Sequence, residues 1–180
     1  MPKFNELPKL VPPAHTKYDI IFATFEDVLA DFERDYDLDM SPDFQREHVW
    51  TSHQQIDFVE YFLMGGMSGR DIFFNCPGWN EREATGQMIL VDGKQRLEAL
   101  RAFVHGKIPA FGHMVGDYDG LEKIRYRIRF WINDLSTRAE VLNWYLQINA
   151  GGTPHTKEEI ERVRALLDAE LDAADEPPAP

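Results

Sequence analysis

An acid, a glycine and two bases follow one another closely at Asp92, Gly93, Lys94 and Arg96, and together they could bind phosphate. The apolar run at 88–91 predicts a buried strand before them, and an amphipathic pattern predicts a helix after them. A helix start presents backbone N–H groups and the positive end of the helix dipole, which favours phosphate. Basic residues in a first helical turn are unfavourable unless an anion compensates them. This stretch therefore predicts a phosphate-binding turn between strand and helix.

Each of these residues also has an ordinary structural explanation. Asp92 could cap the helix, which would stabilise it by about 1 kcal/mol, or it could hold a phosphate-bound Mg²⁺ or orient a water as a base. Gly93 suits a tight turn, and the missing side chain equally allows close approach to phosphate. Lys94 fits a surface position as well as a phosphate contact. The nearest acid to Arg96, Glu98, has the wrong spacing for a helical ion pair, which favours a bidentate phosphate contact.

The elements that must position this turn form a mixed α+β pattern in one domain. Period-2 alternation is clearest over 124–132, and capping patterns predict helix starts at Thr24 with Asp27 and at Ser52 with Gln55. The expected strands span 17–23, 72–75, 88–91 and 124–132, and the expected helices span 24–34, 52 to the glycines at 65–66, 94 to near 106, 137–149 and 157–173.

Composition narrows the classes of function. With 43% hydrophobic and 28% charged residues, we expect a globular protein without a signal peptide or a membrane-spanning run. The single cysteine, Cys76, favours a reducing cytoplasm. The net charge of −12 argues against broad non-specific DNA binding, although a pocket for one nucleotide needs only a few donors. Arg125, Arg127 and Arg129 form either a solvated strand face or a local nucleic-acid contact. There is no zinc spacing, Walker A sequence, His-Asn-His nuclease pattern or nucleophile elbow.

Three segments, in this order, resemble one family. Residues 42–50 (PDFQREHVW) are similar to its P-x-(Y/F)-Q-R-x-x-x-W segment, 91–97 (VDGKQRL) to its V-D-G-Q-Q-R-L core, and 148–154 (INAGGTP) to its L-N-x-G-G-x-P segment. The family is that of the N-terminal half of GmrSD type IV restriction enzymes, and it is related to the ParB/sulfiredoxin superfamily. The resemblance spans about residues 17–167, and Lys94 stands where the family has glutamine.

The resemblance implies a ParB/sulfiredoxin-like fold, in which helices surround a small mixed sheet. The folded domain is expected at 17–167, with an extended arm at 1–16 and an acidic Ala/Pro tail at 168–180 that is disordered beyond the last helix. A nucleoside triphosphate (NTP) is the implied ligand, with Mg²⁺ held by Asp92. The implied catalytic residues are Asp92, Arg96 and Arg46. The implied nucleotide-binding residues are Gly93, Lys94, Gln95, Gln45, Asn149, Gly151 and Gly152.

Family members are associated with nucleotide hydrolysis that controls DNA cleavage, often in defence against phage. The first hypothesis is therefore an NTP-hydrolysing or phosphate-transferring domain in a restriction or phage-defence system. Large members carry a second, HNH-type nuclease domain, and this chain ends where that domain would begin. The alternatives are a non-catalytic module or decoy that binds nucleotide or modified DNA beside a separate nuclease, a small ParB-like nuclease, and a phosphotransferase acting on a small molecule or a modified base. The base of the nucleotide and the oligomeric state stay open.

Overall fold

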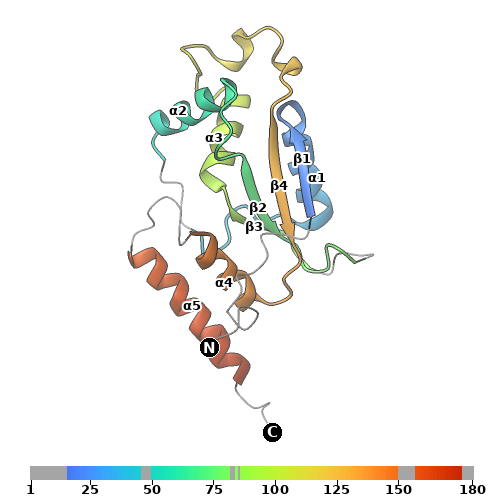
Figure 1. The fold of residues 1–180 in the computed structure, drawn as a ribbon, viewed down its shortest axis with the longest axis vertical. Coiled ribbons are helices and arrows are strands. Elements are labelled where there is room, and N and C mark those ends of the chain that lie inside the picture. Colours follow the sequence, from blue (N-terminus) through green and yellow to red (C-terminus); the bar gives the residue numbers. More distant parts are fainter. Residues whose placement is uncertain (1–15, 46–49, 82–83, 85, 150–156, 176–180) are drawn as a thin grey trace, which may run out of the picture.

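A four-stranded sheet flanked by helices organises the computed structural model of the chain (Figure 1). The structure describes residues 16–45, 50–81, 84, 86–149 and 157–175. The strands are β1 (Thr16–Ile21), β2 (Asp71–Asn75), β3 (Ile89–Asp92) and β4 (Arg127–Asn133). The helices are α1 (Phe25–Tyr36), α2 (Ser52–Leu63), α3 (Lys94–Val104), α4 (Arg138–Asn149) and α5 (Lys157–Asp175), and short 3₁₀ turns span Phe22–Thr24, Val115–Asp117 and Leu121–Lys123.

The sheet is mixed, with strand order β1-β4-β2-β3. β2 runs parallel to β4, whereas β1 pairs with β4 and β3 pairs with β2 in the antiparallel sense. β4 is central because it pairs with both β1 and β2. Its alternation buries Ile128, Phe130 and Ile132 on one face and turns Arg129 and Trp131 to the other. This arrangement confirms the predicted α+β class.

β4 begins at Arg127, so the predicted start at residue 124 is wrong. The preceding segment forms a 3₁₀ turn at Leu121–Lys123, and Nη1 of Arg125 donates to the carbonyl of Glu122 at 3.0 Å. Local hydrogen bonds of the turn thus replace the ladder there. Arg125 consequently lies before the strand and does not extend a basic stripe along it.

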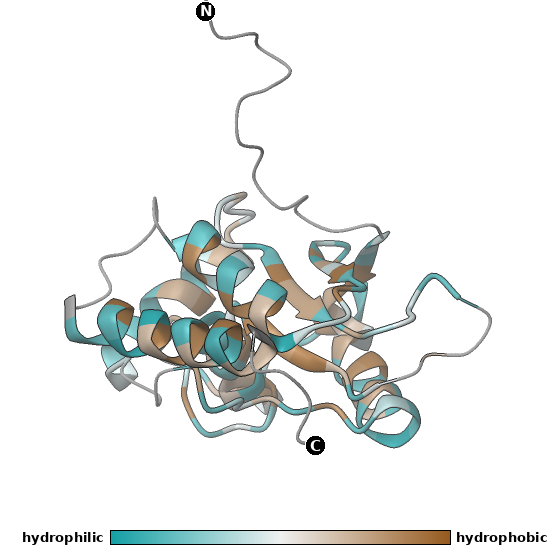
Figure 2. Cartoon of the chain, turned by 90° about the horizontal axis from the view of Figure 1, so that it is seen from below, coloured by the Kyte–Doolittle hydropathy of each residue, from teal (hydrophilic) through white to brown (hydrophobic). Residues whose placement is uncertain are grey.

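Two hydrophobic clusters lie on opposite faces of the sheet. The larger one joins α1, α2 and α3 to the face that carries Ile72 and Phe74. The smaller one packs α4 and α5 against Val91 of β3, and Trp144 of α4 lies edge-on to Phe73 of β2. Figure 2 shows hydrophobic residues in the central strands and hydrophilic residues along the outer sides of the helices. Burial on both faces fixes β3, which carries Asp92 at its end.

Two helix starts are correct in position but not in capping. α2 begins at Ser52 as expected, yet its capping box lies one residue earlier. The Gln54 N–H donates to Oγ1 of Thr51 at 3.3 Å, and the Thr51 N–H donates to Oε1 of Gln54 at 2.9 Å. The predicted box of Ser52 and Gln55 is therefore wrong. Thr24 precedes α1 but makes no side-chain cap, because its hydroxyl donates to a carbonyl of β1 at 3.1 Å.

The first and last elements differ slightly in length from those predicted. β1 begins at Thr16, one residue before the predicted strand, and α5 continues to Asp175, two residues beyond the predicted end of that helix. The rest of the predicted arm, at 1–15, and the last residues, at 176–180, lie outside the described part of the chain. None of the described helices combines the length and the apolar character that a bilayer crossing requires.

Cys76 follows β2 with its side chain fully buried, and burial raises the pKa of its thiol from 9.0 to about 11. Because the thiolate is the reactive form, only about one thiol in a thousand is ionised at pH 8. We expect the folded protein to resist dithionitrobenzoate at pH 8 and to release one equivalent of thionitrobenzoate after denaturation in guanidinium.

The same shift has a defined sign for stability. The fold favours the protonated thiol, so its contribution to the free energy of unfolding is complete below pH 9.0 and is lost as the pH rises through about 11.

Labelling of the native protein at the rate of the denatured protein would contradict the buried position of Cys76.

Candidate functional site

The predicted phosphate-binding turn joins β3 to α3. β3 ends at Asp92, Gly93 is the N-cap residue with a φ of 101°, and α3 begins at Lys94. A Cβ atom at Gly93 would lie 2.6 Å from Cδ1 and 3.3 Å from Cα of Ile72 on β2. Glycine is thus required both by the positive φ and by the close approach of the neighbouring strand. The predicted sequence of strand, glycine turn and helix is confirmed.

Asp92 and Arg96 form an ion pair over the first turn of α3. Arg96 donates from Nη2 to Oδ2 of Asp92 at 2.6 Å and from Nη1 to the backbone carbonyl of Asp71 at 2.8 Å. Asp92 does not cap the helix, because Gly93 is the cap residue and no side chain bonds there. The acid at helical spacing from Arg96 is Asp92, so the inference from Glu98 that Arg96 lacks a helical ion pair is wrong, whereas its predicted contact with phosphate stays a prediction. The two side chains remain 26% and 21% exposed, which leaves the pair open to a ligand.

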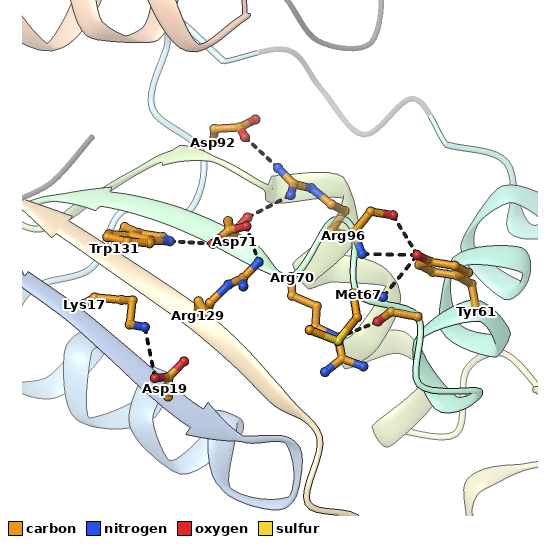
Figure 3. Close-up of polar contacts among 12 residues, drawn as sticks. Lys17, Asp19, Tyr61, Met67, Arg70, Asp71, Asp92, Arg96, Arg129 and Trp131 are labelled. Carbon is orange, nitrogen blue, oxygen red and sulfur yellow. Dashed lines mark hydrogen bonds and ion pairs between the residues drawn. The ribbon is translucent and has the colours of Figure 1, made fainter. Parts of the chain in front are cut away.

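Asp71 connects this pair to the central strand (Figure 3). One oxygen of its carboxylate accepts from Nη2 of Arg129 at 2.6 Å, and the other accepts from Nε1 of Trp131 at 2.5 Å. Neither contact could be predicted from the sequence, since the partners lie 58 and 60 residues away and meet only through the β2–β4 pairing. The available signal was an acid directly before an apolar strand. Arg129, part of the predicted basic stripe, is thus ion-paired.

Arg70 anchors the start of β2 beside Asp71. Its side chain is buried, and Nε donates to the carbonyl of Gly66 at 2.5 Å. Its Cζ atom lies 4.9 Å from the ring centroid of Phe62 and 5.1 Å from that of Tyr126. Burial lowers the pKa of the Arg70 guanidinium. This packing fixes the end of β2 from which Asp71 reaches its partners.

Gln45 and Gln95, both predicted to bind nucleotide, hold backbone segments in place. Nε2 of Gln45 donates to the carbonyl of Leu90 on β3. Oε1 of Gln95, whose side chain is buried, accepts from the N–H of Trp50 at 3.0 Å. Arg162 of α5 donates to the three carbonyls of residues 43–45 at 2.6 to 3.3 Å. The residues on either side of 46–49 are therefore tied to β3, α3 and α5.

The remaining predicted residues lie at an end of α3 or α4 or outside the described part of the chain. Lys94 is half-buried at the first position of α3. Asn149 is the last residue of α4, where Nδ2 donates to the carbonyl of Tyr145 at 2.8 Å. Three predicted residues lie outside the described part of the chain: Arg46, Gly151 and Gly152.

The surroundings of Asp92 fit a magnesium ion that is shared with phosphates. Within the described ranges, no group of three or more His, Cys, Asp or Glu side chains could hold a metal ion alone. Mg²⁺ usually keeps several waters and binds one or two carboxylates together with substrate phosphates. Arg96 bonds Oδ2 of Asp92, and no side chain or backbone group of the described residues bonds its Oδ1. One open carboxylate oxygen beside a helix start suits that kind of site.

Three basic side chains on this face of the sheet are balanced by acids, whereas Arg127, exposed at the start of β4, has no ion-pair partner among the described residues. The three ion pairs are Arg96 with Asp92 at 2.6 Å, Arg129 with Asp71 at 2.6 Å and Lys17 with Asp19 at 3.2 Å. This local neutrality suits a small ligand better than a long polyanion. A separate cavity of about 390 Å³ opens elsewhere, between residues 39–44 and the start of α4, and does not include the turn.

The fold and the site together define a small α+β domain with an acid–arginine pair where an edge strand, a glycine turn and a helix meet. The family model of the GmrSD restriction endonuclease N-terminal domain matches residues 25–127, more than half of the chain. The chain therefore belongs to this family. The match contains the segments at 42–50 and 91–97, whereas 148–154 lies beyond it. No curated protein and no solved structure matches the chain.

Proposed function

We propose that this chain is the nucleotide-binding domain of a DNA restriction system and that it hydrolyses an NTP at the turn between β3 and α3. The observation that carries the proposal is the pairing of Asp92 with Arg96 at 2.6 Å, partly exposed beside a helix start. The family description, the N-terminal domain of a restriction endonuclease, supports the restriction context. DNA and a separate nuclease domain or subunit are the partners that this context suggests.

The start of α3 would bind the phosphates. The first N–H groups of a helix have no acceptor within the helix, and Gly93 places no side chain in front of them. The first turn of α3 contains no acidic residue, so the positive end of its dipole is directed at an incoming anion. Lys94 and Arg96 add positive charge to the same turn. A triphosphate supplies the anion that compensates this charge.

Asp92 and Arg96 would divide the chemistry. Arg96 is held by two acceptors, so its guanidinium is oriented before substrate binds and can neutralise charge that develops on the transferred phosphate. Oδ1 of Asp92 would hold Mg²⁺ or accept the proton of the attacking water. Mg²⁺, when bound, neutralises phosphate charge as a Lewis acid.

Replacing Asp92 with asparagine removes the charge and keeps the size of the side chain. We expect phosphate release from the preferred NTP, with Mg²⁺ present, to fall by about 10²-fold or more. The measurement is steady-state phosphate release from ATP, GTP, CTP and UTP. Glu26→Gln is the matched control. Glu26 of α1 is 27% exposed, and it pairs at 3.1 Å with Arg101 of α3, the helix that also carries Arg96. This control should keep the wild-type rate.

Equal rates in the wild type and in Asp92→Asn would remove the hydrolytic role. Calorimetric binding of an NTP without turnover would support a second candidate, a module that binds nucleotide and acts through a nuclease partner. This candidate is favoured by the engagement of Arg96 with two acceptors of the protein itself. Absence of nucleotide binding would exclude both candidates.

A further inference from the structure

Two aromatic rings lie next to the acid–arginine pair on the same face of the sheet. In the register of the strands, Phe73 of β2 is opposite Asp92 of β3, and Trp131 of β4 is opposite Phe73. The two rings are nearly parallel, with an interplanar angle of 13° and centroids 6.4 Å apart. Both side chains are half-buried, and Trp144 of α4 lies edge-on to Phe73 with the ring centroids 6.0 Å apart. Such rings beside a polar site can contact a ligand.

Trp131 is held in a defined orientation before any ligand binds. Its Nε1 donates to Oδ1 of Asp71 at 2.5 Å, which turns the indole along the sheet toward β2 (Figure 3). From the opposite side, Nζ of Lys17 lies 5.8 Å from the ring centroid. The carbonyl of Asp71 accepts from Arg96, so a single residue connects the indole to the arginine of the turn. A ring that is already fixed loses little freedom when a ligand stacks on it.

The two bases nearest the rings, Arg129 and Lys17, favour a small aromatic ligand over a nucleic-acid strand. Arg129 is 30% exposed and Lys17 is 41% exposed, but each is paired with an aspartate. Binding of a strand relies on uncompensated bases that neutralise successive phosphates. A nucleobase is uncharged and stacks on aromatic rings regardless of such pairing.

We propose that Phe73 and Trp131 form the base-binding subsite for the nucleotide whose phosphates bind at the Asp92–Arg96 turn. This inference rests on the proposed function and names its substrate as a nucleoside triphosphate rather than a bare polyphosphate. Neighbouring strands lie about 4.8 Å apart, so Trp131 is about 10 Å from Asp92 across Phe73. A ribose and its phosphate chain can span that separation.

Calorimetry with two kinds of ligand tests the subsite: the β,γ-imido analogues of ATP and GTP, and inorganic tripolyphosphate, each with Mg²⁺. We expect the wild type to bind the better analogue at least about 10-fold more tightly than tripolyphosphate. Trp131→Leu should abolish this preference and leave the affinity for tripolyphosphate unchanged. Trp131→Phe, which keeps a ring, should retain the preference. Tyr18→Leu is the matched control, because Tyr18 is 41% exposed on β1 and faces away from Trp131.

Each other outcome is decisive. Equal affinity of the wild type for nucleotide and tripolyphosphate would overturn the base subsite and leave the phosphate site standing. A parallel loss of both ligands in Trp131→Leu would mean that Trp131 acts only through Asp71, and it would also overturn the subsite. Binding of oligothymidylate that depends on Trp131, with an unchanged nucleotide preference, would assign the rings to a nucleic-acid strand instead. Binding of neither ligand by the wild type would overturn the subsite and the proposed function together.

Discussion

Replacement of Arg96 by lysine is expected to lower nucleotide turnover by about 10²- to 10³-fold while the fold persists. The guanidinium reaches Oδ2 of Asp92 and the carbonyl of Asp71 at once. An ammonium group cannot satisfy both acceptors and also bind phosphate in a bidentate manner. Because the pair is partly exposed, the expected loss in free energy of unfolding is about 1 kcal/mol or less. Phosphate release and urea unfolding, measured on the same preparation, check both expectations.

Arg101→Lys makes the same chemical change elsewhere on α3. Arg101 pairs with Glu26 at 3.1 Å and is 30% exposed, so its environment is comparable to that of Arg96. It lies away from the turn, and its replacement should leave turnover unchanged. Equal losses in the two variants would trace the effect to the stability of α3 and not to the contacts of Arg96.

Replacement of Gly93 by alanine is expected to lower the free energy of unfolding by about 3 kcal/mol. The φ of 101° is unfavourable for a residue with a side chain. In addition, the new Cβ atom would lie 2.6 Å from Cδ1 of Ile72, so the strand or the helix must shift. Urea unfolding followed by circular dichroism measures the loss.

Two companion variants separate the backbone from the packing contribution. Gly112 has a φ of 76°, and a Cβ atom there would meet no other group within 4 Å, so Gly112→Ala reports the backbone cost alone, about 1 kcal/mol. Ile72→Val removes the closest atom and should make Gly93→Ala less damaging than in the wild-type background. If Gly93→Ala cost no more than Gly112→Ala, the close approach of β2 to the turn would be contradicted.

Helices and strands were predictable here because each pattern reflects burial within one element. The alternation along β4 marked its buried face correctly, since Ile128 and Phe130 both enter the core. Its start was misplaced because the same alternation continues through residues whose hydrogen bonds belong to a 3₁₀ turn. The capping box of α2 moved by one residue for a similar reason, since adjacent residues offered equivalent side chains at Thr51 and Ser52.

The site was less predictable, because its contacts cross between strands. The pair of Asp92 with Arg96 obeys helical spacing, but Asp92 lies in β3 before the cap residue, where the helical rule alone does not predict a pair. The bonds of Asp71 to Arg129 and Trp131 require the parallel pairing of β2 with β4, which no local pattern contains. The catalytic and nucleotide-binding roles of all the predicted site residues remain predictions, and Arg46, Gly151 and Gly152 also lie outside the described part of the chain.

Because β2 pairs in parallel with β4, the segment that matches the family model is shorter than the sheet that supports it. The recognisable stretch, 25–127, reaches only the first residue of β4, yet β4 pairs with both β1 and β2. Without its flanks, β2 would lose one side of its ladder, and Val91 would lose the cover of Trp144 and Val163. Mutations in these flanks can therefore impair the turn from a distance. A segment that carries the motif but lacks the flanks would lack the packing that holds the turn in place.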